Sequence, residues 1–169
     1  LITLKDLGID DEVEEHGETH QDNAFLKAKY FFEKTGLPTL GEDSGIYVDA
    51  FPGELGVKTR RFRDLHTATD EQWIEFFMNE MKSVPDEKRT ARFVCVACVI
   101  IDGKPHFFEG ECRGVITHEL KAPIKEGIPL SSCFKPNGFD KVYSALTPRE
   151  KINIGHRGRA IEKVREFLV

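Results

Sequence analysis

Apolar positions along this chain follow two different spacings, and together they predict an α/β protein. Residues 38–41 and 46–50 read as short strands, and the unbroken apolar run over residues 93–101 is typical of a buried strand. The turn pair at residues 102–103, Asp-Gly, predicts a tight hairpin after this run. Its return strand then covers residues 105–112.

Helical spacing begins at two capping boxes, residues 19–22 and residues 69–72, and the first predicts a helix through about Thr35. A short helix is expected to end the chain. No repeat, low-complexity tract or linker divides the sequence, so one domain over residues 1–169 is expected, a twisted mixed sheet flanked by helices. The apolar stripes of the three helices are Phe25, Ala28 and Phe32, then Trp73, Phe76, Phe77 and Met81, then Ile161, Val164 and Leu168.

Composition fits this picture and excludes several classes of protein. The 169 residues are 40% hydrophobic and 31% charged, so the chain can bury one sizeable core. A net charge of -5 argues against a general nucleic-acid binder, which needs a basic surface. No apolar run reaches the length of a membrane span, and the default expectation is a cytoplasmic protein that does not bind membranes.

Two adjacent carboxylates, Glu42 and Asp43, stand with Ser44 between the first two predicted strands. Placed at a strand end, one of them, best Asp43, could point into a cleft because neighbouring strand residues face opposite ways. A carboxylate there could hold Mg²⁺, which binds through one or two carboxylates and substrate phosphates. An ordinary acidic turn is the alternative interpretation.

Two cationic clusters could meet a phosphate. Asn23 and Lys27 lie four residues apart on the first predicted helix and share a face, although a solvated surface pair is the alternative. His156 and Arg157 lie between two glycines before the last helix, where backbone amides can approach an anion. A charged loop without a ligand is the alternative there. The other histidines are interpreted as surface or structural residues: His16, His20, His66, His106 and His118.

The four cysteines include a Cys-x-x-Cys pair, Cys95 and Cys98, which could suggest zinc or redox chemistry. The pair lies within the buried strand, where residues three apart point to opposite faces and cannot chelate one ion. Free buried thiols are therefore expected, and they suit a reducing compartment.

Six segments, in this order, closely resemble the inosine triphosphate pyrophosphatase family, also called the Ham1 family. Each motif is weak by itself, but the shared order is specific. The resemblance covers nearly the whole chain. The segments are residues 15–28, 42–50, 53–62, 91–95, 110–116 and 150–160.

The resemblance implies hydrolysis of the purine nucleoside triphosphates ITP, dITP and XTP to the monophosphate and pyrophosphate, with magnesium. It also implies a homodimer, with a nucleotide cleft between two lobes. Asp43 would be the metal-associated carboxylate and candidate base, Glu14 or Glu15 the second acid at the metal, and Lys27 a catalytic cation. The implied substrate-binding residues are Asn23, Ser44, Arg61, Ser131, Lys151, His156 and Arg157.

Two departures from the family pattern qualify these expectations. Family members begin with a strand and a Thr/Ser-x-Asn-x-x-Lys loop that grips the triphosphate, and this chain enters after them, so an N-terminally incomplete domain is expected. Residues 127–134 replace the family's Gly-Phe-Gly-Tyr-Asp-Pro-x-Phe, with Ile128, Leu130 and Ser131 in place of Phe, Tyr and Asp. Two alternatives follow: a catalytically weakened nucleotide-binding or interaction protein of the same fold, and a pyrophosphatase with altered base specificity.

Overall fold

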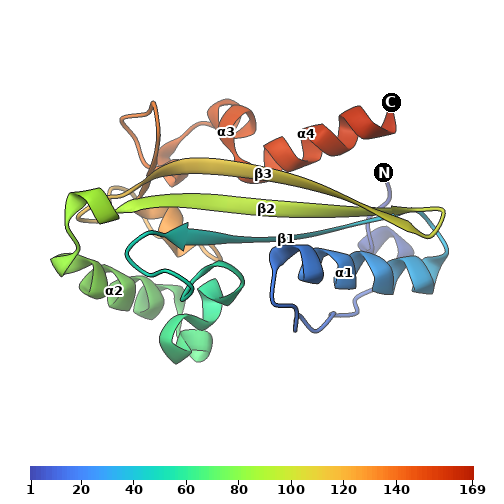
Figure 1. The fold of residues 1–169 in the computed structure, drawn as a ribbon, viewed down its shortest axis with the longest axis horizontal. Helices are drawn as coiled ribbons and strands as arrows, with labels where there is room; N and C mark the ends of the chain where they lie inside the picture. The colour runs from blue at the N-terminus through green and yellow to red at the C-terminus, as the bar shows by residue number, and fades with distance from the viewer.

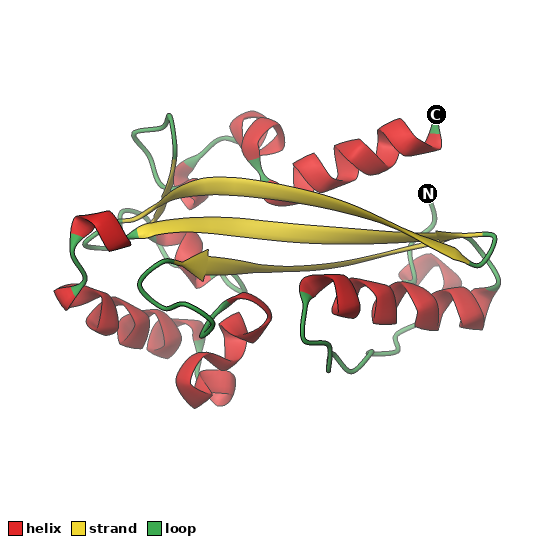
Figure 2. Cartoon of the chain, in the orientation of Figure 1, coloured by secondary structure: helices red, strands yellow, loops and turns green.

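The computed structural model describes residues 1–169 and contains one four-stranded sheet covered by helices (Figures 1 and 2). The strands lie in chain order: β1 Thr39–Val48, β2 Thr90–Ile101, β3 Lys104–Ile116 and β4 Phe134–Pro136. The α-helices are α1 His20–Thr35, α2 Asp70–Glu80, α3 Pro148–Ile154 and α4 His156–Leu168. The 3₁₀ segments are η1 Lys5–Leu7, η2 Gly56–Thr67, η3 Met81–Ser83, η4 Asp86–Lys88, η5 Pro129–Ser132 and η6 Tyr143–Ala145.

All three strand pairings are antiparallel, so the expectation of a mixed sheet is wrong in this respect. The connections explain the difference, because a parallel pairing needs a crossover along the sheet. Between β2 and β3 the chain turns back at once through Asp102 and Gly103, both with positive φ, which confirms the expected hairpin. Between β1 and β2 the chain forms η2 and α2 and re-enters the sheet at the same end, where Val48 pairs with Ala91.

Both expected capping boxes are present and begin α1 and α2. The Thr19 hydroxyl accepts a hydrogen bond from the backbone N–H of Asp22, and the Asp22 carboxylate accepts one from the backbone N–H of Thr19. Thr69 and Gln72 make the equivalent exchange. Each box satisfies amide groups that the first helical turn leaves unpaired, which fixes where each helix begins.

Alternation along β2 gives the sheet two differently covered faces. Val94, Val96, Cys98 and Ile100 pack against Ala24 and Ala28 of α1. On the opposite face Cys95, Ala97 and Val99 pack against Ala160 and Val164 of α4. Cys95 and Cys98 are thus free thiols buried in different clusters, as the sequence predicts.

The face that packs on α4 at one end of β2 packs on α2 at the other end. There Ala91 and Phe93 join the largest apolar cluster of the chain, with Trp73 and Phe77 of α2 and Phe62 of η2. Because the sheet twists, α4 lies above it in Figure 1 and α2 below it. The molecule therefore has two lobes along the sheet, one with α1 and α4 and one with α2 and η2.

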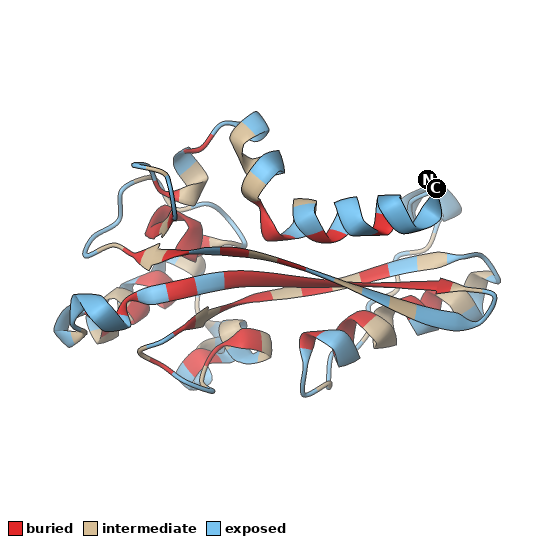
Figure 3. Ribbon diagram, turned by 45° about the horizontal axis from the view of Figure 1, so that its top comes forward, coloured by how far each residue is buried: buried red, intermediate tan, exposed pale blue.

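The expected apolar stripe of the last helix is only partly correct. Val164 is buried, but Ile161 and Leu168 are 43% and 58% exposed. The buried row is His156, Ala160 and Val164, one every fourth residue, and Figure 3 shows this face of α4 turned toward the sheet. In this structure no helix combines the length and the apolar character that crossing a membrane requires.

Candidate active site

The acidic pair Glu42 and Asp43 lies in the middle of β1, not at a strand end as expected from the sequence. The two segments that read as separate strands form one continuous strand, because β2 pairs with every residue from Thr39 to Val48. The expected alternation holds within it. Asp43 contacts α1, whereas Glu42 and Ser44 contact α4 on the other face.

Asp43 is buried and receives three side-chain donors from α1. His20 Nδ1 lies 2.7 Å from Oδ2, Asn23 Nδ2 lies 3.4 Å from the same oxygen, and Lys27 Nζ lies 3.4 Å from Oδ1. The expectation that Asn23 and Lys27 share a face is therefore confirmed, and His20 completes that face. From the sequence, His20 is expected to be a surface or structural residue; it is buried and hydrogen-bonded to Asp43, so it is not a surface residue.

The electrostatic environment keeps Asp43 ionised. Burial alone raises the pKa of this carboxyl, but the hydrogen bond from His20 and the charge of Lys27 outweigh burial, and the net pKa is lowered. An ionised carboxylate at this position can attract a cation or accept a proton from water.

A second carboxylate, Glu15, is linked to Asp43 by the Lys27 ammonium group. Its Oε1 lies 2.6 Å from Lys27 Nζ, so one ammonium group contacts both Glu15 and Asp43. A cation already lies between two carboxylates there, and hard oxygen donors suit Mg²⁺. Glu14, the other candidate acid, is exposed and does not line the cavity described below. No group of three or more His, Cys, Asp and Glu side chains is assembled as a metal site.

On the opposite face of β1, Glu42 and Ser44 contact Arg157 of α4. Arg157 Nη2 lies 2.9 Å from Ser44 Oγ, and its guanidinium lies 3.3 Å from the carboxylate of Glu42. Arg157 follows the start of α4, so this contact anchors the α4 end of the site to β1.

A cavity of about 410 Å³ joins these groups between the two lobes. Glu15 and Asp43 lie on its wall, and four cationic side chains, two of them unexpected, also line it: Arg60, Lys125, Lys151 and Arg157. Burial, with help from nearby Lys125, lowers the pKa of Lys151. With four cations and two carboxylates, the cavity favours an anionic ligand.

His156 lines the cavity as a neutral ring. Burial, reinforced by the charge of Arg157, lowers its pKa to about 4. The imidazole stacks on Phe93 at 5.1 Å between ring centres and 17° between planes, and its buried Nδ1 has no hydrogen-bond partner. A neutral imidazole can accept a hydrogen bond from an uncharged ligand group or donate one to it.

Comparisons with known proteins identify the family of this chain. The model of the Ham1 family matches residues 1–167. The chain belongs to the Ham1 family. It is 34% identical to the dITP/XTP pyrophosphatase of Clostridium perfringens, covering 99% of this chain and 84% of that protein. It is 37% identical to the dITP/XTP pyrophosphatase of Dictyoglomus thermophilum, with coverages of 99% and 82%.

Solved structures of the Ham1 family share the fold. The Staphylococcus aureus Ham1 protein superposes with a TM-score of 0.85 at 30% identity, over 99% of this chain and 85% of that one. The structure of the nucleoside-triphosphatase or dITP/XTP pyrophosphatase of Mycobacterium abscessus gives a TM-score of 0.73 at 30% identity, with coverages of 96% and 85%.

In this Ham1 family member the segment that departs from the family pattern also lies in the cavity. Ile128, Leu130 and Ser131 all line it, and Ser131 Oγ donates to the carbonyl of Ile128 at 2.7 Å. The aromatic rings in the wall come from other elements: Trp73 of α2, Phe93 of β2 and Tyr143 of η6.

The structure gathers most of the expected site residues around the cavity. Five of them line it directly: Ser44, Ser131, Lys151, His156 and Arg157. Asn23 and Lys27 do not line the cavity but contact Asp43, which does.

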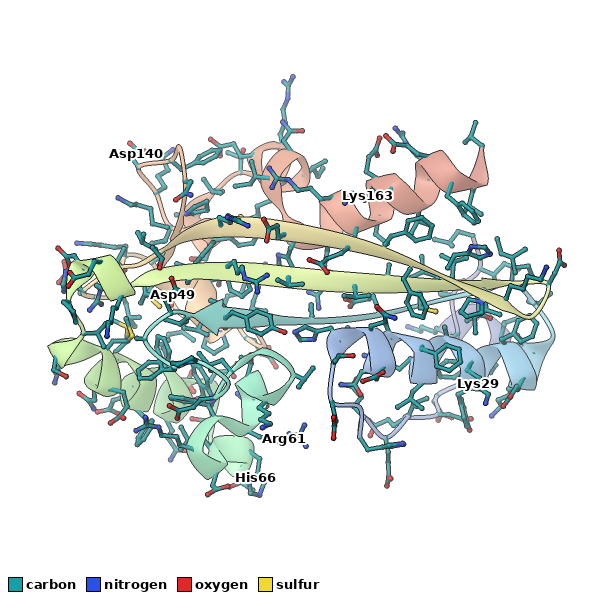
Figure 4. All side chains as sticks on the ribbon, in the orientation of Figure 1. Lys29, Asp49, Arg61, His66, Asp140 and Lys163 are labelled. Carbon is teal, nitrogen blue, oxygen red and sulfur yellow. The ribbon has the colours of Figure 1, made fainter.

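Arg61 does not line the cavity. It is exposed on η2 (Figure 4), and its neighbour Arg60 takes the cavity position. In a 3₁₀ segment successive side chains point about a third of a turn apart, so only one of the two arginines can face inward.

Proposed function

We propose that this chain hydrolyses the deaminated purine nucleoside triphosphates dITP, XTP and ITP to the monophosphate and pyrophosphate. The observation that carries the proposal is one cavity joining an ionised Asp43 with a cationic lining suited to a triphosphate. The relatives support it, because proteins named dITP/XTP pyrophosphatase match 99% of this chain.

In the proposed reaction water attacks the α-phosphorus and the bond to the bridging β-oxygen breaks. Asp43 accepts the proton of the attacking water, and pyrophosphate leaves with the electron pair of the broken bond. Lys125, Lys151 and Arg157 offset the charge on the phosphates, so their effect is positioning and electrostatic stabilisation. Magnesium, held by Asp43 and Glu15 with the substrate's phosphates, would supply further charge neutralisation.

Product analysis tests this proposal directly. Phosphorus NMR of a reaction with dITP and magnesium should show pyrophosphate and the monophosphate as the first products. Orthophosphate with a nucleoside diphosphate would contradict it and indicate a different phosphatase. The single tryptophan, Trp73, lines the cavity, so its fluorescence should report nucleotide binding separately from turnover. Binding without turnover would indicate the catalytically weakened alternative.

A second candidate is a pyrophosphatase with altered base specificity. Ile128 and Leu130 present aliphatic side chains to the cavity, while its rings come from Trp73, Phe93 and Tyr143. A panel of ITP, XTP, dITP, ATP, GTP and dUTP, each with and without magnesium, separates the two candidates. The first predicts the largest kcat/KM for ITP, XTP and dITP, and the second predicts it for another base.

We further propose that the protein is cytoplasmic and forms a homodimer. All four cysteines are free and buried, which fits a reducing compartment. The homodimer rests on the family resemblance, and light scattering of the purified protein would test it. A monomer at micromolar concentration would contradict that part of the proposal.

A further inference from the structure

His20 and Asp43 form a buried pair that the proposed mechanism does not explain. Their side chains are 3% and 10% exposed, and Nδ1 lies 2.7 Å from Oδ2. Asp43 lines the cavity and His20 does not. We propose that His20 is a positioning residue, which holds the Asp43 carboxylate in its reactive orientation through this hydrogen bond. The inference rests on the proposed function of Asp43.

The fold fixes the position of the His20 ring from three sides. His20 is the first residue of α1, directly after the Thr19 cap, so its backbone is set by the capping box. The ring lies against Gly45, where an added Cβ would come within 2.8 Å of His20 Cε1. It also packs edge-on against Tyr47, with ring centres 5.8 Å apart and planes at 88°.

The surroundings of His20 also select its tautomer. Asp43 is ionised and can only accept a hydrogen bond, so Nδ1 of His20 carries the proton and donates it. Nε2 is buried and has no hydrogen-bond partner. A proton on Nε2 would be a buried donor without an acceptor, whereas a lone pair there is tolerated more easily. The ring therefore donates through Nδ1 to one oxygen of the Asp43 carboxylate.

The two oxygens of the Asp43 carboxylate contact different groups. His20 holds Oδ2 at 2.7 Å, and Asn23 adds only a longer contact of 3.4 Å. Oδ1 faces the Lys27 ammonium, which also contacts Glu15. Fixing Oδ2 sets the plane of the carboxylate and thereby the direction of Oδ1. Without His20, Oδ2 would keep only the longer Asn23 contact, and the orientation of the carboxylate would be less firmly held.

Two variants with an amide side chain separate the effect of the hydrogen bond to Asp43 from the effect of the volume of the His20 side chain. In His20→Asn the amide nitrogen can take the place of Nδ1, whereas in His20→Gln it lies further out, near the place of Nε2. We expect His20→Gln to lower kcat by about ten- to a hundredfold, the usual effect of losing an orienting partner, while KM changes less. His20→Asn should recover most of that loss. His66→Phe is the control, because His66 is exposed on η2 and points away from the sheet (Figure 4).

Folding and nucleotide binding are followed in the same variants, by thermal unfolding and by Trp73 fluorescence. A purely structural role predicts equal kcat for His20→Asn and His20→Gln at equal folded fraction. That result, or a kcat of His20→Gln within about twofold of the parent, would overturn the inference, since an orienting partner is worth more.

Nitrogen-15 NMR of the imidazole tests the pair without any turnover. The parent should show the proton on Nδ1 and the lone pair on Nε2 of His20. The opposite tautomer would overturn the inference even if the protein hydrolyses dITP. A parent with the expected tautomer but no hydrolysis of any nucleotide would refute the proposed function and leave the His20–Asp43 contact confirmed.

Discussion

The buried His156 ring should make the free energy of unfolding sensitive to acid, and its replacement by phenylalanine should remove part of that sensitivity. Burial lowers the pKa of His156 from 6.5 to about 4, so the folded protein resists protonation that the unfolded chain accepts. Stability is fully present above about pH 6.5 and falls as the pH drops toward about 4, where the folded protein binds the proton as well. His156→Phe keeps an aromatic ring on Phe93 and abolishes the titration.

The magnitude follows from the two pKa values. Between about pH 7.5 and about pH 4.5, a group with pKa 6.5 unfolded and about 4 folded reduces the free energy of unfolding by about 2.5 kcal/mol. Other groups that titrate in this range are present in both parent and variant, so the comparison of the two isolates the contribution of His156. The parent should therefore lose about 2.5 kcal/mol more than His156→Phe over the same change of pH.

Urea denaturation at the two pH values measures this difference, with His66→Phe as the matched control. His66 is exposed, so this control removes a histidine without removing a buried ring. If the parent and His156→Phe lose the same free energy of unfolding within about 0.5 kcal/mol, the ring is not held neutral by burial and the reasoning is refuted.

Three further variants test the site and the core. Asp43→Asn should lower kcat by about a hundredfold or more, because it removes the charge that accepts a proton, with circular dichroism unchanged. Lys27→Ala should raise KM and lower kcat together in steady-state kinetics, because its ammonium contacts both Asp43 and Glu15; a change in KM alone would contradict this. Arg89→Met should lower the free energy of unfolding by about 3 kcal/mol, since a buried guanidinium donates to four backbone carbonyls, whereas exposed Arg149→Met should have little effect in the same urea assay.

The sequence predicts the face of α1 that meets Asp43 only in part. Helical spacing correctly places Asn23 and Lys27 together, and the same spacing puts His20 three residues before Asn23 on that face. This was the available signal for His20. The spacing does not identify the contact, because the partner of His20 lies 23 residues away on another element and the pair forms only when α1 packs on β1.

The strand that carries the acids shows where local propensity fails. Glu42 and Asp43 stand between Gly41 and Gly45, and glycine and acidic residues are depleted in strands, so the sequence predicts a break between two short strands here. In the structure β2 pairs with the whole segment and overrides that preference. The alternation of side chains survives, because it depends only on the strand geometry and not on how the strand is stabilised.

The site as a whole depends on the register between β1 and β2. Ile46 and Val48 are buried in the large core on the face that also carries Ser44. A slip of one residue would move both to the other face, and it would turn Asp43 toward α4 and Ser44 toward α1. The apolar core thus selects the register, and the register then brings Asp43 to α1 and Ser44 to Arg157, 113 residues further along the chain. Local spacing alone cannot predict that second contact, because it also requires α4 to pack on the sheet.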